Sequence, residues 1–423
     1  MERYNEYKDS GVQWLGEIPS HWEVVRLKSV IKDSQSGVWG EDPKHDGSDT
    51  LCLRVADFNY NNGYLKEDNL TYRNYGKELS SNKQLQMRDL LLEKSGGGDL
   101  YPVGRVVRYN FNGIVATCSN FIQKLTPRDN VDSDFIYYLF RTMYYLKVNG
   151  LYYNQTTGIQ NLKVKEYLSQ TVFLPPLSEQ QAIANYLDTA TAKIDEAIAQ
   201  QQKMIDLLNE RKQIIINNAV TKGLNPDAPM KDSGVEWIGE IPEHWMTRRM
   251  RYLCKIKTGD KDTINRVDEG KYPFYVRSPK VERINSYTFD GEAVLMAGDG
   301  VGAGKVFHYV NGKFGCHQRV YIFHDIKNIN GEYLYFYMKS LFKHTIEQLS
   351  AKSTVDSVRL NMIQDFIVAI PTNEEQTSIL SYLHKQIEKF DVAIANATKQ
   401  ISLLQERKQI IINDVVTGKV KVC

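Results

Sequence analysis

The chain has 423 residues, which is too long for one ordinary domain and sufficient for two or three. Hydrophobic residues make up 42% and charged residues 25%, a composition typical of a globular protein and not of a disordered chain. Lys and Arg number 53 against 51 Asp and Glu, so the formal charge of +2 excludes a generally basic nucleic-acid coat but not a local basic site.

The cysteines and the N-terminus predict the cellular compartment of the protein. The five cysteines form no CxxC motif and have no histidine nearby at the spacing of zinc ligands. Such an odd, scattered set is typical of reduced thiols, so we expect a cytoplasmic protein without a metal site. The polar N-terminus has no apolar signal-peptide core, and no apolar run approaches the roughly 20 residues that span a bilayer, so no membrane partner is expected.

Two segments of the chain occur twice. Residues 8–22 read KDSGVQWLGEIPSHW and match residues 231–245, KDSGVEWIGEIPEHW, at 12 of 15 positions. Residues 207–221, LLNERKQIIINNAVT, recur at 403–417 as LLQERKQIIINDVVT. The offset falls from 223 to 196, so the second copy is 27 residues shorter between these blocks. The sequence therefore predicts two copies of one plan: an opening motif, a variable globular part and a long terminal segment.

The opening motif is interpreted as a structural clasp in preference to a binding site. Its paired tryptophans, Trp14 with Trp22 and Trp237 with Trp245, can bury a large area, and a proline stiffens each turn.

The variable parts, residues 23–175 and 246–371, have short apolar runs broken by turn residues, which predicts strands. Two aromatic-rich stretches, Asp134–Lys147 and Gly331–Glu347, are predicted helices among them. Each variable part is therefore expected to be a mixed α/β domain of roughly 150 residues, so the fold class is α+β with an internal repeat.

The terminal segments are predicted to be long helices. Apolar residues recur at alternating gaps of three and four, from Ile379 to Val415 in the second copy and at matching places in the first. Ser178 is expected to cap the first helix, and Thr372 or Asn373 the second. About 40 residues give helices near 60 Å long. A solvent-exposed linker is the alternative, but a continuous apolar seam needs a partner, and the other helix is the simplest one.

Known catalytic motifs do not fit the chain. The glycine-rich stretch Gly298–Lys305 lacks the register of a P-loop, and a flexible loop that approaches a partner is the better interpretation. The sequence has no [DN]PP[YF] tetrapeptide, no GxSxG and no HExxH motif, and its eight histidines do not cluster. A duplicated plan without a catalytic motif points to recognition or assembly, with no enzymatic activity and no cofactor.

Positive charge collects around two glycine-rich loops, Ser95–Arg105 in the first half and Gly298–Lys305 in the second. Residues 83–128 hold seven basic groups against three acidic ones, and residues 271–319 hold seven against four. Gly104–Arg105 matches Gly304–Lys305, and Cys118–Asn120 matches Cys316–Gln318. Arg, Lys, Asn and Gln are the side chains that contact phosphates and base edges, so recurrence at matching places favours a nucleic-acid site in each half.

With these features, the chain resembles the specificity subunits of type I restriction–modification enzymes, the HsdS family. The resemblance rests on the duplicated SGVxWxGEIPxHW motif, on the helix entries Leu174–Ile183 and Ile370–Ile379, and on the paired helices, and it covers essentially the whole chain. It implies target-recognition domains at 1–177 and 223–371, joined by conserved helices at 178–222 and 372–423 that pack as an antiparallel coiled coil.

The resemblance also implies function and partners. Each recognition domain would bind one half of a bipartite site in double-stranded DNA, and the unlike domains predict an asymmetric site. The helices would set the spacing and dock two modification (methyltransferase) subunits, after which restriction (ATP-dependent nuclease) subunits would join. Two alternatives stay open: a coiled-coil scaffolding protein that binds other proteins, and a specificity protein of another methylation-based defence system.

Candidate DNA-contacting residues lie in or after the glycine loops and, in the first half, in the polar stretch Asn154–Asn161. They are Lys94, Arg105, Arg108, Asn120, Thr157, Gln160 and Asn161 in the first half, and Arg277, Ser278, Lys305, His317, Gln318, Arg319, Lys352, Ser353 and Thr354 in the second.

Overall fold

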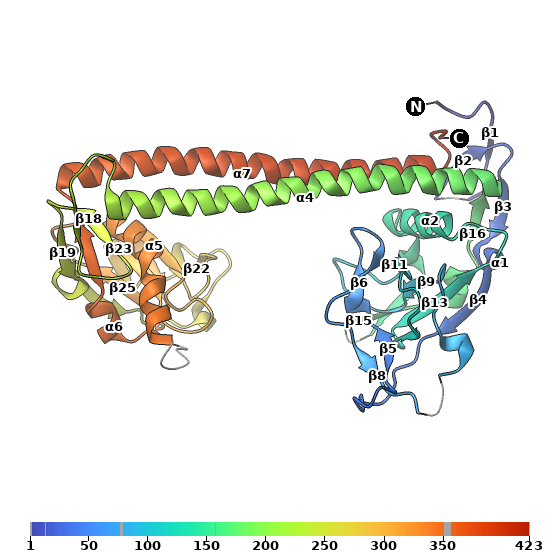
Figure 1. Cartoon of the computed structure of the whole chain (residues 1–423), viewed down its shortest axis with the longest axis horizontal. Helices are drawn as coiled ribbons and strands as arrows, with labels where there is room; N and C mark the ends of the chain where they lie inside the picture. Colours follow the sequence, from blue (N-terminus) through green and yellow to red (C-terminus); the bar gives the residue numbers. More distant parts are fainter. Residues whose placement is uncertain (1, 13, 77–78, 157, 351–356, 423) are drawn as a thin grey trace. The chain divides into compact units, whose positions relative to one another are not determined.

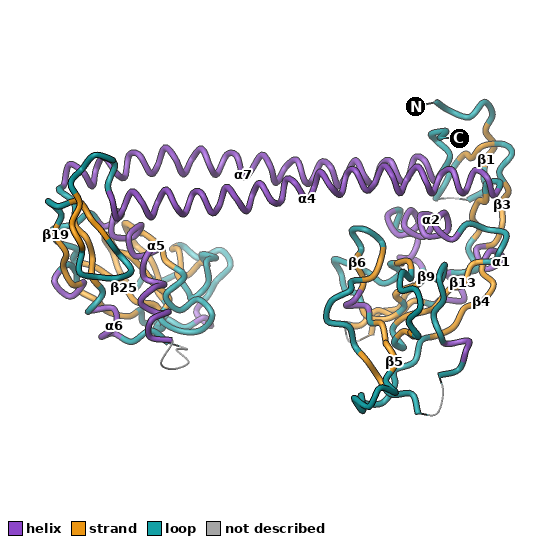
Figure 2. Tube along the Cα trace, in the orientation of Figure 1, coloured by secondary structure: helices purple, strands orange, loops and turns teal. Residues whose placement is uncertain are grey.

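The computed structural model describes residues 2–12, 14–76, 79–156, 158–350 and 357–422. The chain divides into two compact units: unit 1 is Met1–Gln202 with Thr398–Cys423, and unit 2 is Lys203–Ala397. Figure 1 colours the chain along its sequence, and Figure 2 colours the same view by secondary structure. Each unit takes a part of both long helices, α4 (Leu177–Lys222) and α7 (Asn373–Val416).

Unit 1 mixes helices and strands. Its four-stranded sheet has the order β11-β9-β13-β4, and the other sheets are β12-β5-β8, β10-β15-β14, β16-β3, β1-β2 and β6-β7. The helices are α1 (Leu27–Val30), α2 (Ser133–Tyr145) and α3 (Val164–Tyr167). The strands are β1 (Tyr7–Asp9), β2 (Glu17–Pro19), β3 (Glu23–Arg26), β4 (Ile31–Ser36), β5 (Thr50–Leu53), β6 (Phe58–Asn59), β7 (Tyr64–Leu65), β8 (Tyr72–Arg73), β9 (Leu90–Glu93), β10 (Ser95–Gly96), β11 (Val106–Arg108), β12 (Ala116–Cys118), β13 (Ile122–Pro127), β14 (Tyr153–Thr156), β15 (Ile159–Leu162) and β16 (Thr171–Leu174).

Unit 2 has a six-stranded sheet in the order β20-β25-β23-β24-β21-β22, with the pairs β19-β26 and β17-β18. Its helices are α5 (Gly331–Ser350) and α6 (Leu360–Gln364). The strands are β17 (Met230–Asp232), β18 (Glu240–Pro242), β19 (Met246–Arg249), β20 (Lys255–Thr258), β21 (Tyr272–Tyr275), β22 (Glu282–Ile284), β23 (Phe289–Ala297), β24 (Phe307–Cys316), β25 (Val320–His324) and β26 (Ile367–Ile370).

The two units repeat one topology. The antiparallel order β4-β13-β9-β11 in unit 1 corresponds to β20-β25-β23-β24 in unit 2. A parallel contact also recurs, between β12 and β5 and between β24 and β21. The predicted α+β fold with an internal repeat is therefore confirmed.

Helices α2 and α5 occupy matching places, close to the predicted ranges. Asp132 caps α2 by accepting a hydrogen bond from the Phe135 amide at 2.8 Å. Asn330 caps α5 in the same way, accepting from the amides of Glu332 and Tyr333. The aromatic residues that follow each cap turn one face of the helix towards the core.

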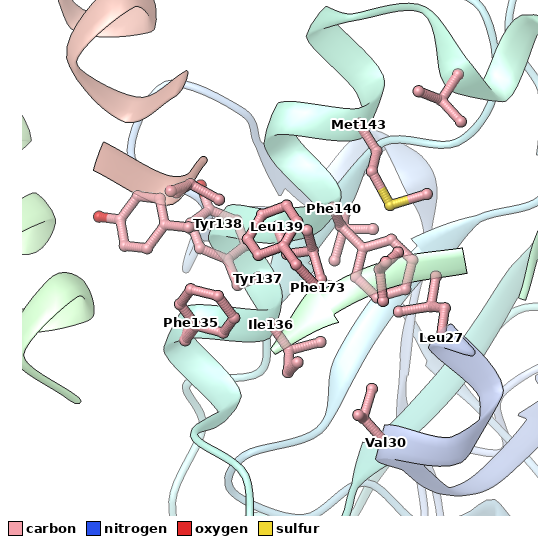
Figure 3. Packing of buried hydrophobic residues seen from close by; sticks show 14 of the residues in the cluster. Leu27, Val30, Phe135, Ile136, Tyr137, Tyr138, Leu139, Phe140, Met143 and Phe173 are labelled. Carbon is pink, nitrogen blue, oxygen red and sulfur yellow. The ribbon is translucent and has the colours of Figure 1, made fainter. Parts of the chain in front are cut away.

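The core of unit 1 forms around α2. Figure 3 shows the side chains of α2 packed with Leu27, Val30 and Phe173, and the buried α2 residues include Phe135, Tyr138 and Phe140. Trp22 stacks on Phe173 with ring centroids 5.3 Å apart, which joins the opening motif to this core. The same cluster contains Ile183 and Leu187 of α4 and Ile412 and Val415 of α7. Burial of this apolar surface therefore attaches the unit to both helices.

The long helices begin close to the predicted positions. They contain 46 and 44 residues, or about 69 and 66 Å at the usual rise. Thr372 caps α7, because its hydroxyl accepts from the Glu375 amide and Glu375 accepts from the Thr372 amide. The predicted cap of α4 was wrong: Ser178 lies inside the helix, and the Pro176 carbonyl accepts from the amides of Glu179 and Gln180.

The helices run antiparallel within each unit. In unit 1, Lys408 of α7 pairs with Asp195 of α4, with Nζ–Oδ1 at 2.6 Å. In unit 2, Lys212 of α4 pairs with Asp391 of α7, with Nζ–Oδ1 at 2.5 Å. Lys408 is the repeat of Lys212, and Asp391 is the repeat of Asp195, each at the offset of 196. The same ion pair therefore forms twice, with the lysine on α7 in unit 1 and on α4 in unit 2.

The opening motif is the expected clasp. Trp22 Nε1 donates to Glu179 Oε2 at 3.0 Å, and His21 Nε2 lies 2.7 Å from Glu179 Oε1. In unit 2, Glu375 accepts from Trp245 at 3.3 Å and contacts His244 at 2.9 Å. Trp22 also packs at the end of α7, where a Cβ on Gly418 would meet its ring. Trp245 packs at the end of α4, where a Cβ on Gly223 would meet its ring.

The glutamine of each helix entry ties three segments together. Gln180 donates to the Pro175 carbonyl at 2.7 Å and accepts from the Asp132 amide at 2.9 Å. Gln376 donates to the Pro371 carbonyl at 3.0 Å and accepts from the Asn330 amide at 2.6 Å. Both glutamines are buried, so their hydrogen bonds fix the start of each long helix against α2 or α5.

No helix among the described residues combines the length and the apolar character that crossing a membrane requires.

Candidate nucleic-acid interface

The same turn is built in both units, between β12 and β13 in unit 1 and between β24 and β25 in unit 2. In unit 1, the Ser119 amide donates to the Leu53 carbonyl, and the Ile122 amide donates to the Ser119 carbonyl. In unit 2, the His317 amide donates to the Tyr275 carbonyl, and Val320 donates to His317. Along each turn the first residue is buried and the next two are exposed. The exposed pairs are Asn120 with Phe121 and Gln318 with Arg319.

A glycine packs against each turn, where two backbone segments approach each other closely. A Cβ on Gly37 would lie 2.1 Å from the Ser119 carbonyl oxygen, and one on Gly259 would lie 2.2 Å from that of Cys316. Larger residues would therefore push the turn away from its sheet. We call residues 118–122 and 316–320, with the glycine loop beside each, the recognition turns.

A cavity of ≈ 630 Å³ adjoins the recognition turn of unit 1. Arg105, Asn120 and Phe121 line it, together with Trp39 and the Ser95–Gly97 loop. Trp39 and Phe121 each keep 43% of their surface exposed, and the Arg73 guanidinium lies 4.4 Å from the Trp39 ring centroid. Exposed rings beside amide and guanidinium groups suit contact with nucleobases and sugars.

The Arg105 side chain is held in place at this cavity. Its guanidinium makes two hydrogen bonds to Glu93, at 2.8 and 3.0 Å, and lies 3.8 Å from the Tyr60 ring centroid. The Glu93 side chain is 1% exposed, and its burial raises the pKa of the carboxyl while Arg105 acts against that rise. A bidentate pair of this kind fixes the orientation of the guanidinium.

The described residues of the predicted polar stretch lie mostly in β14 and β15, which pair antiparallel, and β15 also pairs with β10 of the glycine loop. Ser95 is opposite Asn161, whose side chain accepts a hydrogen bond from the Ser95 hydroxyl at 2.8 Å. Gln160 is buried and accepts from the Val103 amide at 3.1 Å. Lys94 donates to the Ser36 hydroxyl, and its burial lowers the pKa of the ammonium group. Gln160 therefore supports the loop, while Asn161 is exposed beside it.

In unit 2, one carboxylate orders two arginines. Asp299 accepts from Arg277 at 3.1 Å, and Arg319 Nε lies 3.6 Å from its second oxygen. The guanidinium-bearing side chains of Arg277 and Arg319 are 47% and 64% exposed. The glycine loop packs on the Arg277 backbone, because a Cβ on Gly302 would lie 2.3 Å from the Arg277 carbonyl oxygen.

The remaining predicted residues of unit 2 surround this pair. His317 Nδ1 accepts from the Arg319 amide at 3.0 Å, and burial together with the nearby Arg277 charge lowers the pKa of His317. Gln318 donates to Asp262 at 3.0 Å, and Ser278 donates to the Lys280 carbonyl. Lys305 is exposed on the glycine loop. The structure thus places the buried His317 and the exposed Gln318 beside the two arginines.

The glycine loops match at Gly104 and Gly304 but differ by one residue after them. The Gly104 amide donates to the Glu93 carbonyl, and the Gly304 amide donates to the carbonyl of Ala297, the residue that matches Glu93. In the opposite direction, the Glu93 amide donates to the Arg105 carbonyl, but the Ala297 amide donates to the Val306 carbonyl. Lys305 is therefore an added, exposed residue, whereas the Arg105 backbone bonds to Glu93 directly before β11.

Arg108 lies elsewhere in unit 1. It is 6% exposed and donates to Asp134 and to Asp188 of α4, each at 2.9 Å. Its guanidinium also lies 4.0 Å from the Tyr64 ring centroid. This geometry favours a role in attaching the sheet to α2 and α4. Thr157, Lys352, Ser353 and Thr354 lie outside the described residues.

Several site residues were not predicted. Phe121 could have been found, because it follows Asn120 as Arg319 follows Gln318 in the repeat. Trp39, Glu93 and Asp299 gave no such signal, since their partners are 12 to 34 residues away in the chain and only the fold brings them together.

Comparison with known proteins agrees with the duplicated geometry. A family model described as "Type I restriction modification DNA specificity domain" matches twice, over residues 19–205 and 242–403. The specificity subunit of the type I restriction enzyme EcoDI from Escherichia coli is 31% identical over 181 residues, which cover 43% of this chain and 40% of that relative. The MjaVIII specificity subunit from Methanocaldococcus jannaschii is 25% identical over 455 residues, covering 100% of this chain and 98% of that relative.

One solved structure shares the whole fold. A chain described as "Structural basis underlying complex assembly and conformational transition of the type I R-M system" superposes with a TM-score of 0.70 at 14% identity. The match covers 95% of this chain and 99% of that chain.

Proposed function

The chain belongs to the type I restriction–modification DNA specificity family, and we propose that its two units each recognise one half of a bipartite, asymmetric site in double-stranded DNA. The observation that carries this proposal is the recognition turn, which has one backbone frame in both units but different exposed side chains. An amide and a phenyl ring are exposed in unit 1, and an amide and a guanidinium in unit 2. Unlike side chains on a common frame favour unlike half-sites.

Direct base contacts are assigned to the exposed turn residues. Asn120 and Gln318 carry amides that can pair with adenine in the major groove, and Arg319 carries a guanidinium suited to guanine. Asp299 orients this arginine, and the Trp39–Phe121 cavity accommodates apolar base surface. Lys305, exposed and without a part in the sheet, is assigned to phosphate.

The long helices are assigned to spacing. Helices of about 66 to 69 Å have the length of roughly two DNA turns of 34–36 Å each. In this proposal residues 1–177 and 223–371 are the recognition domains, and residues 178–222 and 372–423 are the spacer helices. A change in helix length would then change the number of base pairs between the half-sites.

The helices also carry repeated apolar surface for partners. Leu207 and Ile214 in unit 2 are 54% and 51% exposed, and their repeats in unit 1, Leu403 and Ile410, are 47% and 46% exposed. Each pair is seven residues apart, so both side chains lie on one helix face. Two equivalent surfaces fit two copies of one partner. We assign these surfaces to two modification subunits, which supply the methyltransferase activity. Restriction subunits join afterwards. The chain itself then has no catalytic role.

The proposal is tested with the chain purified together with its modification subunits. Selection from a random duplex library should enrich one motif with two specified halves and an unspecified spacer. Hydroxyl-radical footprinting of that duplex should protect two separate segments. Stable assembly of the subunits without sequence selection would instead support a scaffolding protein.

A further inference from the structure

The two units differ at the repeated ion pair between the helices. In unit 1, the Lys408 side chain is 6% exposed and its Asp195 partner 31%. In unit 2, the Lys212 side chain is 24% exposed and its Asp391 partner 57%. The same pair is therefore covered in one unit and open in the other.

The cover in unit 1 comes from the β6–β7 hairpin. Lys408 Nζ donates to the Asn61 carbonyl at 2.6 Å, and the Gly63 carbonyl accepts from the Arg108 amide at 2.8 Å. Tyr64, the first residue of β7, packs on the Arg108 guanidinium. Arg108 in turn neutralises Asp134 and Asp188. The hairpin thus covers Lys408 of α7, and Arg108 links α2 to α4.

Unit 2 has neither feature among its described residues. Residues 54–71 connect β5 to β8 and include the hairpin, whereas residues 276–281 alone connect the matching strands β21 and β22. The residue that matches Arg108 in the sheet is Tyr309, and its hydroxyl donates to Glu292 at 2.8 Å. His384 replaces Asp188 and contacts Glu332, the residue that matches Asp134, at 2.8 Å.

The consequence is a groove between α5 and α7. It has a volume of ≈ 470 Å³, and Phe336 of α5 and Ile387, Val392 and Ala395 of α7 give it an apolar surface. Its polar lining residues are His384, Glu388 and Asp391. Two of these are carboxylates, and Glu332 adds a third beside His384.

We propose that this groove receives a turn of the modification subunit bearing a lysine or arginine, which does for unit 2 what the β6–β7 hairpin and Arg108 do for unit 1. A carbonyl of that turn accepts from Lys212, which stays paired with Asp391, an apolar side chain covers Ile387 and Val392, and the cation faces Glu388. The inference rests on the proposed function, because it takes its partner from there. The Glu388 carboxylate at the rim favours a cationic turn over an acidic one.

The inference makes the two partner contacts unequal. At unit 1 the modification subunit meets a surface that the chain has already completed. At unit 2 it completes the surface itself, so this contact is more sensitive to changes in the groove.

The test uses the full chain co-expressed with the modification subunits. Val392→Cys places a thiol in the groove at a side chain that is 55% exposed, and Glu196→Cys places one at the matching exposed position in unit 1. We expect maleimide labelling of Val392→Cys to slow at least tenfold on assembly, and labelling of Glu196→Cys to change less than threefold. Equal labelling of Val392→Cys in the free and the assembled chain would overturn the inference.

A second pair of variants measures the energetic effect. Val392→Arg adds bulk and a cation to the groove and should weaken binding of one of the two modification subunits about tenfold, as seen in the subunit stoichiometry by native mass spectrometry. Glu196→Arg should leave both subunits bound. If the wild-type chain assembles with two subunits and selects a bipartite site while Val392→Arg binds as tightly, the groove is not the contact and the proposed function stands. If the wild-type chain binds neither DNA nor subunits, the proposed function itself fails. Slower labelling caused by self-association of the chain, without modification subunits, would also contradict the inference.

Discussion

Asp299 accepts a hydrogen bond from Arg277 at 3.1 Å, across the base of the glycine loop in unit 2. Its other oxygen faces Arg319 of the recognition turn, so one partly exposed carboxylate holds two arginines at the surface assigned to DNA. An arginine that is held before binding loses less conformational entropy when it contacts a base.

Replacing this carboxylate should therefore reduce sequence discrimination. We expect Asp299→Asn to lower the preference for the specific site over one with a scrambled second half by about tenfold, or ~1.4 kcal/mol. Fluorescence anisotropy with the two duplexes measures this ratio. Asp290→Asn is the control, because Asp290 pairs only loosely with Lys313 at 3.9 Å. An equal loss in both variants would show that the charge, and not the orientation of the arginines, matters.

Lys305 should behave as a phosphate contact. Lys305→Ala is expected to weaken binding to all duplexes alike and to reduce the slope of log K against log salt by about 1. Gln318→Ala should leave that slope unchanged and cost about 1–3 kcal/mol at one base position. Binding titrations at several salt concentrations distinguish the two effects. A sequence-dependent loss in Lys305→Ala would contradict its assignment.

The clasps should make stability depend on pH in the acid range. Burial acts to raise the pKa of Glu179, but hydrogen bonds from Trp22, His21 and Tyr4 outweigh it and lower the pKa below its usual value of 4.5. A carboxyl with a lowered folded-state pKa contributes stability that is complete above the unfolded-state pKa and is lost as the pH falls through the folded-state pKa.

Glu179→Gln should thus reduce the loss of stability below about pH 4.5. The free energy of unfolding, followed by tryptophan fluorescence in urea between pH 3 and 7, tests this expectation. Glu374→Gln, at an exposed position of the first turn of α7, serves as the control. The same acid sensitivity in Glu179→Gln and the wild-type chain would contradict the role of the clasp.

The two helix ion pairs should differ in their contribution to stability. Lys408→Met leaves Asp195 and the Asn61 carbonyl without their donor in a covered position and should cost about 1–3 kcal/mol. Lys212→Met removes a more exposed pair and should cost about 0–1 kcal/mol. Urea unfolding with both variants compares them. A larger loss of unfolding free energy in Lys212→Met would contradict the expectation that the covered pair contributes more to stability.

Much of the fold could be predicted because the duplication is visible in the chain. The repeated tryptophans and prolines predicted a clasp, and the structure joins it to the helix entry through Trp22 and Glu179. The heptad spacing predicted the helix pair. Ser178 was assigned as a cap from its residue type, but the entry through two prolines lets the Pro176 carbonyl take that place.

The site was less predictable, because exposure and pairing depend on the fold. Arg108 and Arg105 look alike in sequence, yet Arg108 is buried against α4 and Arg105 lines a cavity. The register of the glycine loops also differs by one residue, which separates Lys305 from Arg105. Local patterns located the recognition turns, while the partners that orient their side chains come from distant strands.

In the proposed function, each unit recognises its own half of the DNA site. Single-molecule methylome sequencing of a host with the wild-type chain, Asn120→Ala or Gln318→Ala tests it most directly. We expect one bipartite, asymmetric methylated motif for the wild type, relaxed in one half by Asn120→Ala and in the other half by Gln318→Ala. A motif without two separate halves, or relaxation of the same half by both variants, would contradict it.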